Sequence, residues 1–307
     1  MKNYKQLLEE NKAWAEELFN KIDKKMSAVT LRSRNKLPDG VDENGFHIER
    51  GIHWWTNGFW GGLNWLLYNK TGNEDYKITA QTSEKKMDEA LKNFSMLHHD
   101  VGFMWHILSG ASYRLTGNED SKNRNLFAAA TLASRYVLDG GYLVAWNGKG
   151  CQNWTIVDCL MNLAQLYWAS EVIGDDRFKR IAMAHADSTM LDHVREDGSV
   201  IHGVDHDRET GEPVKTFAGQ GARDGSSWSR GQAWGLYGFV LSYKHTGDAR
   251  YLDAAKRLFA MYLEHGMTAN YANYNWFGRP EWTEPCAIID SFLCAMQLYA
   301  ETGARDY

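Results

Sequence analysis

Apolar residues recur at helical spacing along most of the chain. Leucine, alanine, methionine and aromatic side chains return every three or four residues, which is typical of helices with one buried face. This periodicity predicts ten helices, near residues 4–27, 57–71, 75–96, 102–115, 120–138, 154–173, 176–195, 227–246, 249–265 and 286–301. Strand patterns are weak and limited to short pieces such as 140–146 and 199–203. The sequence therefore predicts an all-α protein.

One short turn is repeated between these helices. It occurs as YNKTGNEDY at 68–76, YRLTGNED at 113–120, YKHTGDARY at 243–251 and YAETGARDY at 299–307, with a looser copy, SEVIGDDRF, at 170–178. Glycine in this context ends one helix in the left-handed conformation, and a following Asn or Asp caps the next helix. The aromatic residue after it can pack back. Each copy is therefore predicted to join two helices of a hairpin.

Repeated hairpins at these intervals predict a stacked or toroidal array of helix pairs. Its closed form is an (α/α)6 toroid or barrel of six pairs, whereas only ten helices are predicted here. The chain ends just after a turn that opens a further helix. We therefore expect the last helix pair to be missing; a bundle of five pairs with a frayed tail is the alternative.

Length and charge limit the classes of protein that fit. A chain of 307 residues suits one large domain, so we expect a single domain over 1–307. The 34 basic and 39 acidic residues give a net charge of −5, which argues against nucleic acid as a partner. No apolar run approaches 18 residues, and the N-terminal helix lacks the apolar segment of a signal peptide. We expect no membrane association and a cytoplasmic location.

The cysteines form neither a C-x-x-C motif nor a zinc-binding pattern. They are expected to be free thiols in a reducing compartment. The four are Cys151, Cys159, Cys286 and Cys294.

Tryptophan is unusually frequent, with 13 residues that gather in glycine-rich segments. Flat apolar rings with polar neighbours suit a sugar-binding cleft, although a tryptophan-rich core fits the composition equally well. The first such segment is HWWTNGFWGGLNWLLY, 53–68. Trp55 precedes the expected helix and is the candidate sugar platform. Gly61 and Gly62 are better explained by close helix packing.

The segment LHHDVGFMWH, 97–106, contains a carboxylate between histidines and an apolar helix. Asp100 is well placed to cap that helix. A carboxylate at a helix N-terminus beside His98 or His99 can also serve catalysis, because the helix dipole and hydrogen bonds tune its charge. No further ligands stand at defined spacing, so no metal is expected.

Asp158 stands in the apolar segment CQNWTIVDCLMNLAQLYWA, 151–169. A lone Asp inside an apolar helix is costly unless it is paired or functional. Asn162, one turn later, could hydrogen-bond it. Burial would favour the protonated form that a general acid requires. The alternative is a structural Asp satisfied by backbone donors.

The segment FAGQGARDGSSWSRGQAWGLYGF, 217–239, brings polar side chains among tryptophans. Arg230 has Trp228 and Trp234 near it in sequence, and a guanidinium there suits a carboxylate or a stacking role. An interior ion pair with an Asp is the alternative. Gln220 and Gln232 flank it. His202 and His206, in SVIHGVDHD at 199–207, are weak candidates by themselves.

Two separated carboxylates, many tryptophans, an arginine and a histidine are typical of a carbohydrate-active enzyme. No phosphate-binding loop, dinucleotide fingerprint or nucleophile elbow competes. The motifs WTNGFWGGLNWLLYNKTG, HHDVGF, IVDCLMNL and SSWSRGQAWGLYGF are similar to those of the unsaturated glucuronyl hydrolases, glycoside hydrolase family 88. The resemblance runs from about residue 1 to 265 and implies an (α/α)6 barrel.

The resemblance also implies a reaction. Members of this family act on oligosaccharides left by polysaccharide lyases, which carry a 4,5-unsaturated uronic acid at the non-reducing end. They hydrate the vinyl ether instead of attacking the anomeric carbon, and the resulting hemiketal rearranges and releases the sugar. Neither a metal nor an organic cofactor is used.

Carried onto this chain, the resemblance implies roles for nine residues. Asp158 matches the general acid/base, and Asp100 matches the second essential carboxylate. The implied substrate-binding residues are Trp55, His99, Trp146, His202, Gln220, Arg230 and Trp234. After about residue 266 the sequence departs from the family pattern, and the binding residues of the last helix pair are not found.

Two other functions stay open. One is the related unsaturated rhamnogalacturonyl hydrolase, against which the HHD motif argues. The other is a catalytically impaired sugar-binding toroid, which the departing C-terminal segment favours. The sequence specifies neither the preferred uronide nor the oligomeric state.

Overall fold

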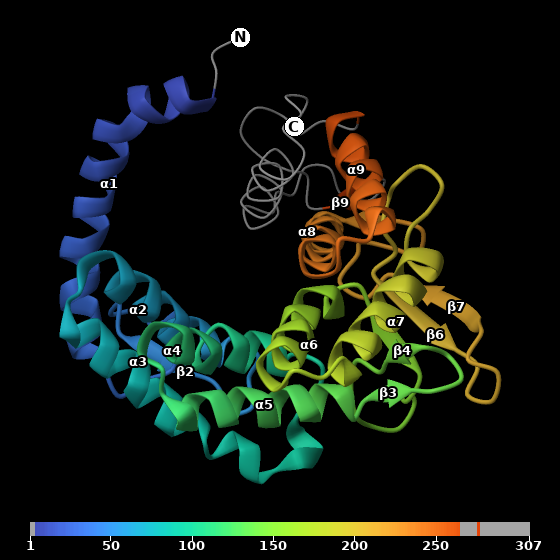
Figure 1. Cartoon of the computed structure of the whole chain (residues 1–307), viewed down its shortest axis with the longest axis horizontal. Helices are drawn as coiled ribbons and strands as arrows, with labels where there is room; N and C mark the ends of the chain where they lie inside the picture. Colours follow the sequence, from blue (N-terminus) through green and yellow to red (C-terminus); the bar gives the residue numbers. More distant parts are fainter. Residues whose placement is uncertain (1–3, 265–274, 277–307) are drawn as a thin grey trace. The chain divides into compact units, whose positions relative to one another are not determined.

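The computed structural model describes residues 4–264 and 275–276 of the chain (Figure 1). Its α-helices are α1 (Tyr4–Arg32), α2 (Asn57–Thr71), α3 (Glu74–Met87), α4 (Ser109–Thr116), α5 (Glu119–Ala133), α6 (Cys159–Ile173), α7 (Arg177–Asp192), α8 (Ser229–Thr246) and α9 (Ala249–Glu264). Two 3₁₀ turns (Ala90–Lys92, Phe94–Met96) and one π-helical turn, η3 (Gly102–His106), complete the helical segments.

Short strands lie between the helices. They are β1 (Pro38–Val41), β2 (His47–Glu49), β3 (Tyr136–Val137), β4 (Tyr142–Leu143), β5 (Trp154–Ile156), β6 (Gly203–His206), β7 (Pro213–Phe217), β8 (Ser227–Trp228) and β9 (Asn275–Trp276). The mostly helical class predicted from the periodicity is confirmed, although strands are more numerous than expected.

Several predicted helices are shorter than the periodicity suggests. The segment expected as helix over 75–96 ends at Met87, and that expected over 102–115 divides into η3 and α4. The helix expected over 154–173 begins only at Cys159, because residues 154–156 pair with β6 instead. The helix expected at 286–301, the last copy of the turn, Cys286 and Cys294 lie outside the described residues.

The repeated turn has the conformation that its sequence predicts. The glycine after each helix has a φ between 68° and 72° and donates its backbone N–H to a carbonyl four residues earlier. The next Asn or Asp accepts a backbone N–H of the following helix through its side chain. The glycines concerned are Gly72, Gly117, Gly174 and Gly247.

Two of the aromatic residues in these turns fasten the new helix to an earlier one. Tyr76 is fully buried, and its hydroxyl donates to the Asp23 carboxylate of α1 at 2.6 Å. Tyr251 is fully buried as well, and its hydroxyl donates to the Asp187 carboxylate of α7 at 2.9 Å. The turn thus connects more than the two helices that it joins in sequence.

The described chain divides into two compact units. The first contains the residues up to Lys92 and Ile107–Lys122, and the second contains Asn93–His106 and the residues from Asn123 onward. In the first unit α2 and α3 pack side by side, and α1 packs on α3 (Figure 1). In the second, α6 packs on α7 and α8, and α8 packs on α9. The single domain expected over 1–307 stays a prediction.

Helix α6 is the centre of the second unit. Eleven of its 15 residues are buried, so it is not amphipathic as a surface helix would be. Its contact with α8 is close: a Cβ on Gly238 would lie 2.3 Å from the Leu160 Cβ. Small residues likewise allow close packing in the first unit, where a Cβ on Gly61 would lie 2.2 Å from a Leu108 methyl group.

A three-stranded antiparallel sheet, in the order β5-β6-β7, leads into α6. Ile156 of β5 is paired with Gly203 of β6, and the next backbone N–H, that of Val157, donates to the His202 carbonyl at 3.0 Å. The register therefore brings the residues after β5 beside those before β6.

None of the helices in the described part of the chain combines the length and apolar composition that a membrane crossing needs. The cytoplasmic location stays a prediction.

Candidate active site

Asp158 occupies the junction between β5 and α6. It is the residue immediately before the helix, not a residue inside it as the apolar pattern suggested, because the helix begins at Cys159. Its side chain makes no hydrogen bond to the helix N-terminus, although it is only 4% exposed. Among the described residues no donor satisfies its Oδ2, so the structure gives no support to the structural role that we considered, a buried Asp satisfied by backbone donors.

His202 lies beside Asp158. Its Nε2 is 3.2 Å from the Asp158 Oδ2, and both side chains are buried. The backbone N–H of Gln220 donates to its Nδ1 at 2.8 Å, whereas the Ala218 carbonyl lies farther from that atom, at 3.2 Å. The shorter contact requires an unprotonated Nδ1, so the ring proton is assigned to Nε2, which faces the carboxyl group.

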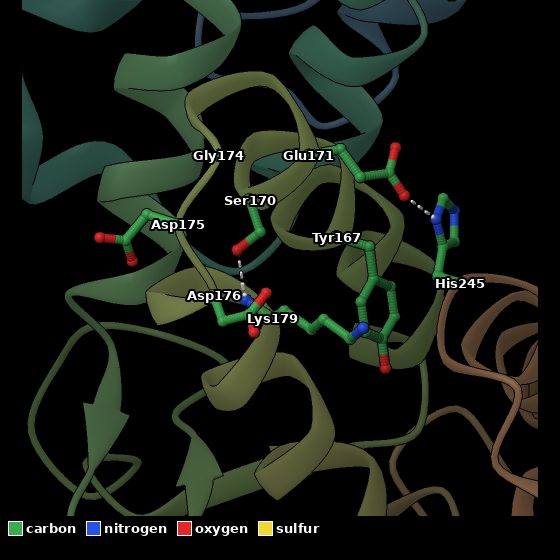
Figure 2. A pocket seen from close by; sticks show the side chains of 8 residues that line it. All are labelled: Tyr167, Ser170, Glu171, Gly174, Asp175, Asp176, Lys179 and His245. Atoms are coloured by element: carbon green, nitrogen blue, oxygen red, sulfur yellow. Dashed lines mark hydrogen bonds and ion pairs between the residues drawn. The ribbon is translucent and has the colours of Figure 1, made fainter.

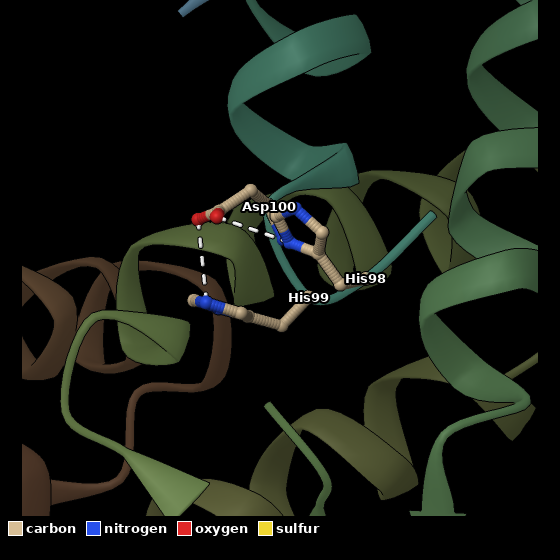
Figure 3. Close-up of side chains that lie close together, drawn as sticks. All are labelled: His98, His99 and Asp100. Atoms are coloured by element: carbon tan, nitrogen blue, oxygen red, sulfur yellow. Dashed lines mark hydrogen bonds and ion pairs between the residues drawn. The ribbon is translucent and has the colours of Figure 1, made fainter. Parts of the chain in front are cut away.

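Asp100 lies between two imidazoles on its own loop (Figure 3). Its Oδ2 is 3.1 Å from His98 Nδ1, and its Oδ1 is 3.4 Å from His99 Nε2. No backbone N–H donates to the carboxylate within the described residues, so the capping role that the sequence suggested is not observed. The helical segment that follows is η3. The backbone N–H of its residue Phe103 donates to the side-chain Oδ1 of Asn162.

Burial and neighbouring charges give this cluster defined protonation states. Burial lowers the pKa of His99 to about 4, so the ring is neutral at pH 7. Burial alone would raise the pKa of Asp100, but His99 and His98 outweigh it and hold the pKa below its ordinary value. Asp100 is therefore ionised.

The same three residues could hold a cation. The ligand atoms of His98, His99 and Asp100 lie within 4.8 Å of one another. Three protein ligands are the number found in catalytic zinc sites. Here, however, the two carboxylate oxygens of Asp100 already face the two imidazoles, so the carboxylate has partners without an ion.

The Arg230 guanidinium lies over two indole rings that are nearly perpendicular to each other. Its guanidinium carbon lies 4.4 Å from the Trp228 ring centroid and 5.3 Å from that of Trp234. Its Nη2 donates to the Gln220 side-chain oxygen at 3.0 Å. Such a stacked, oriented guanidinium suits a planar carboxylate ligand. The contact with both rings fits stacking, which is one of the roles that the sequence suggested for this residue.

The remaining candidates are divided between the two units. Trp146 lies in the second unit with its ring 6.0 Å from that of His99 in an edge-to-face arrangement. The Trp234 ring also contacts Phe103 of η3, at 5.5 Å. Trp55 belongs to the first unit, in the turn before α2, where its ring lies 5.7 Å from that of Phe59.

Several buried polar atoms of the second unit have no hydrogen-bond partner among the described residues. Three of them belong to candidate site residues that lie close together: Asp158 Oδ2, His202 Nε2 and His99 Nδ1. The Asp158–His202 pair is close but not aligned as a hydrogen bond. Because buried polar atoms are nearly always paired, these three mark a place for water or a ligand.

Two residues of this region were not singled out from the sequence as site residues. Asn162 was considered only as a partner of Asp158, but its Oδ1 accepts from the Phe103 N–H and makes no bond to Asp158. Arg135 donates to the carbonyls of Val144 and Leu97 and joins two loops of the site. Its only signal in the sequence was a charge near an apolar segment.

A separate pocket of about 230 Å³ lies toward the other end of α6 (Figure 2). Its polar groups pair mainly with one another: Glu171 with His245 at 2.8 Å, and the Lys179 N–H with Ser170 at 2.8 Å. None of the nine candidate residues lines it; the lining residues are Tyr167, Ser170, Glu171, Gly174, Asp175, Asp176, Lys179 and His245.

Comparison with known proteins identifies the relatives of this chain. The family model described as Glycosyl Hydrolase Family 88 matches residues 22–242. An unsaturated glucuronyl hydrolase of Bacillus sp. (strain GL1) is 39% identical over 213 residues, which is 68% of this chain and 56% of that protein. An unsaturated chondroitin disaccharide hydrolase of Streptococcus pyogenes serotype M1 is 35% identical over 68% of this chain and 53% of its own length.

A solved structure with the same fold, a UGL variant with dGlcA-Glc-Rha-Glc, has a TM-score of 0.84 and 31% identity, and covers 91% of this chain and 76% of that one. Such structures are (α/α)6 barrels, so the fold class predicted from the repeated turn is confirmed. The chain spans about half the length of the curated relatives it matches.

Proposed function

Because the chain belongs to glycoside hydrolase family 88, we propose that it removes a 4,5-unsaturated uronic acid from the non-reducing end of oligosaccharides produced by polysaccharide lyases. Water adds across the C4=C5 bond, with a proton going to C4 and a hydroxyl group to C5. The hemiketal at C5 then opens, its ring oxygen takes up a proton, and the remaining sugar is released.

The observation that carries this proposal is the buried pair of Asp158 and His202. Asp158 is the general acid/base that protonates C4 and helps water to add at C5. His202 Nε2 lies 3.2 Å from the Asp158 Oδ2 without an aligned hydrogen bond, so the imidazole stands beside the carboxyl group that carries the transferred proton. A proton donor must lie within hydrogen-bond reach of its substrate, and the unpartnered atoms of this pair leave room for that contact.

Asp100 has the complementary role. Its lowered pKa keeps it ionised, so it accepts hydrogen bonds from the substrate or the attacking water. Two carboxyl groups in different surroundings can thus do different work in one reaction.

Substrate recognition is assigned to the aromatic and cationic groups. The guanidinium of Arg230, which lies over Trp228 and Trp234, binds the uronate carboxylate. The other proposed sugar contacts are Trp55, His99, Trp146, His202, Gln220 and Trp234. Since one relative is named an unsaturated chondroitin disaccharide hydrolase, an unsaturated chondroitin disaccharide is the first substrate to test.

The experiment follows the near-UV absorbance of the conjugated C4=C5 bond, which hydration removes. We expect loss of absorbance with the chain, and none with Asp158→Asn at an unchanged melting temperature. Asp176→Asn is the matched control, because Asp176 also precedes a helix without a side-chain capping bond but lies outside the site. Full turnover by Asp158→Asn would show that Asp158 is not the general acid/base of the reaction.

Substrate choice separates the remaining functions. Turnover of unsaturated pectin fragments, without turnover of glycosaminoglycan fragments, would identify a rhamnogalacturonyl hydrolase instead. Ligand binding without loss of absorbance, in a chain that melts cooperatively, would identify a sugar-binding protein.

A further inference from the structure

Asn162 connects the segments that carry the two carboxyl groups. It lies on α6, one turn after Asp158, and is 1% exposed. Its side-chain Oδ1 accepts the backbone N–H of Phe103 at 2.8 Å. Phe103 belongs to η3, which begins two residues after Asp100.

The contact is unusually close. A Cβ on Gly102 would lie 2.3 Å from the Asn162 Oδ1 and 2.6 Å from its Cβ. Only a glycine backbone allows η3 to approach α6 this far. Gly102 and Asn162 therefore act together, one making room and the other supplying the acceptor.

The Asn162 Oδ1 acts as an N-terminal cap of η3, although Asn162 itself belongs to α6. The first backbone N–H groups of a helical segment have no partner within it. Asp100 does not cap η3; its carboxylate faces His98 and His99 instead. Because Asn162 satisfies the Phe103 N–H, Asp100 keeps its carboxylate for the site.

Besides the packing of η3 on α6, few hydrogen bonds among the described residues connect the Asp100 loop with the segments around Asp158. The two histidine contacts lie within the loop itself, and the His99 N–H donates to the Ala145 carbonyl of the loop that precedes β5. The hydrogen bond from Phe103 to Asn162 joins the loop to the helix that begins after Asp158. Phe103 follows Asp100 by three residues, and Asn162 follows Asp158 by four. The hydrogen bond therefore links the two carboxyl-bearing residues through short stretches of chain.

On the basis of the proposed function, we propose that Asn162 is a positioning residue: its carboxamide oxygen fixes η3 on the first turn of α6 and thereby sets the place of Asp100 relative to Asp158. The assignment rests on the buried Oδ1 acceptor, the close approach at Gly102 and the absence of a side-chain cap from Asp100. A displacement of about 1 Å between reacting groups can lower a rate by about 100-fold.

The test compares Asn162→Leu, which removes the acceptor, with Asn162→Asp, which keeps an oxygen at the same place. Ser170→Ala is the control, because Ser170 is also buried on α6 and its side-chain oxygen likewise accepts a backbone N–H, that of Lys179 at 2.8 Å, away from η3. For Asn162→Leu we expect kcat to fall about 100-fold with KM changed less than about threefold. Asn162→Asp should recover at least about tenfold of that loss, and Ser170→Ala should stay within about threefold of the wild type.

A second readout does not depend on activity. Hydrogen exchange followed by mass spectrometry reports protection of the amides in 97–106. Asn162→Leu should speed exchange in this segment, whereas Ser170→Ala should not. If Asn162→Leu does not fold, Asn162→Ser, whose side chain is too short to reach Phe103, replaces it.

The outcomes are distinct. Equal loss of kcat in Asn162→Leu and Ser170→Ala, or unchanged exchange in 97–106, would overturn the positioning role. If the wild-type chain turns over no unsaturated uronide, the proposed function fails, and the exchange experiment still decides whether Asn162 holds η3.

Discussion

At the scale of single residues, the tightest contact of the candidate site is between Gly219 and His202. Gly219 has a φ of 57°, and a Cβ there would lie 1.9 Å from His202 Nδ1. Gly219→Ala must therefore move the imidazole away from the Gln220 N–H and from Asp158. We expect kcat/KM on an unsaturated disaccharide to fall about 100-fold in the absorbance assay.

Gly225 offers the matched control for this substitution. Its φ is 83°, and nothing lies within 4 Å of an added Cβ. Gly225→Ala should cost about 1 kcal/mol of backbone strain without displacing His202. Equal activity losses in the two variants would show that strain in the loop, and not the position of His202, lowers the rate.

Buried histidines make the stability depend on pH. Burial lowers the pKa of His185 to about 3 and that of His193 to about 4, whereas the unfolded chain titrates near 6.5. As the pH falls below 6.5, the unfolded state binds protons first. The free energy of unfolding should then decrease, by about 1.4 kcal/mol per pH unit for each histidine, until the folded-state pKa is reached.

Urea unfolding between pH 7.5 and pH 4.5 measures this slope. His185 Nδ1 accepts the Leu143 N–H at 3.0 Å, and Asn places an oxygen near the same position without titrating. His185→Asn should therefore reduce the slope by about one proton. An unchanged slope would show that His185 does not contribute to the acid sensitivity.

At the scale of elements, the glycines of α8 divide into two kinds. Gly247 ends the helix with a φ of 72° and nothing within 4 Å of an added Cβ, whereas Gly238 packs against Leu160 of α6. Gly247→Ala should lower the free energy of unfolding by about 1 kcal/mol through backbone strain. Gly238→Ala should cost about 2 kcal/mol or more by overpacking, even though Ala favours a helix.

Thermal or urea unfolding of both variants checks this order. Activity should change little in Gly247→Ala, because that turn lies at the end of α8 opposite to Arg230. A larger stability loss at Gly247 than at Gly238 would contradict the packing contact between α6 and α8.

Prediction from the sequence succeeded where the chemistry is local. Glycine followed by Asn or Asp determines the turn at Gly72, and the spacing of Arg230 and Trp234 already indicates stacking. It was wrong about residues 154–158, because the apolar run there fits a helix as well as a buried strand. The strand conformation is selected by the pairing of Thr155 with Val204, 49 residues away in sequence. That Asp158 lies close to His202 could therefore be expected only from the resemblance to the family.

At the scale of the whole molecule, the proposed reaction needs no metal ion. The cluster of His98, His99 and Asp100 has the geometry to hold one, but its carboxylate already faces both imidazoles. We expect the initial rate of absorbance loss to be unchanged after dialysis against EDTA. Loss of activity that returns on addition of one divalent cation would make this cluster a metal centre.

The antiparallel register of β5 and β6 has a consequence for changes in chain length. Successive residues of a strand point to opposite faces, so removing one residue between Ile156 and Asp158 would turn the carboxyl group away from His202. Between β6 and β7, the exposed residues around Arg208 and Thr210 carry no such register constraint, provided that Gly211, whose backbone lies against Gly140, is kept. An engineer who wishes to graft a loop for a different sugar should therefore splice it there, and leave the length of the β5–α6 junction untouched.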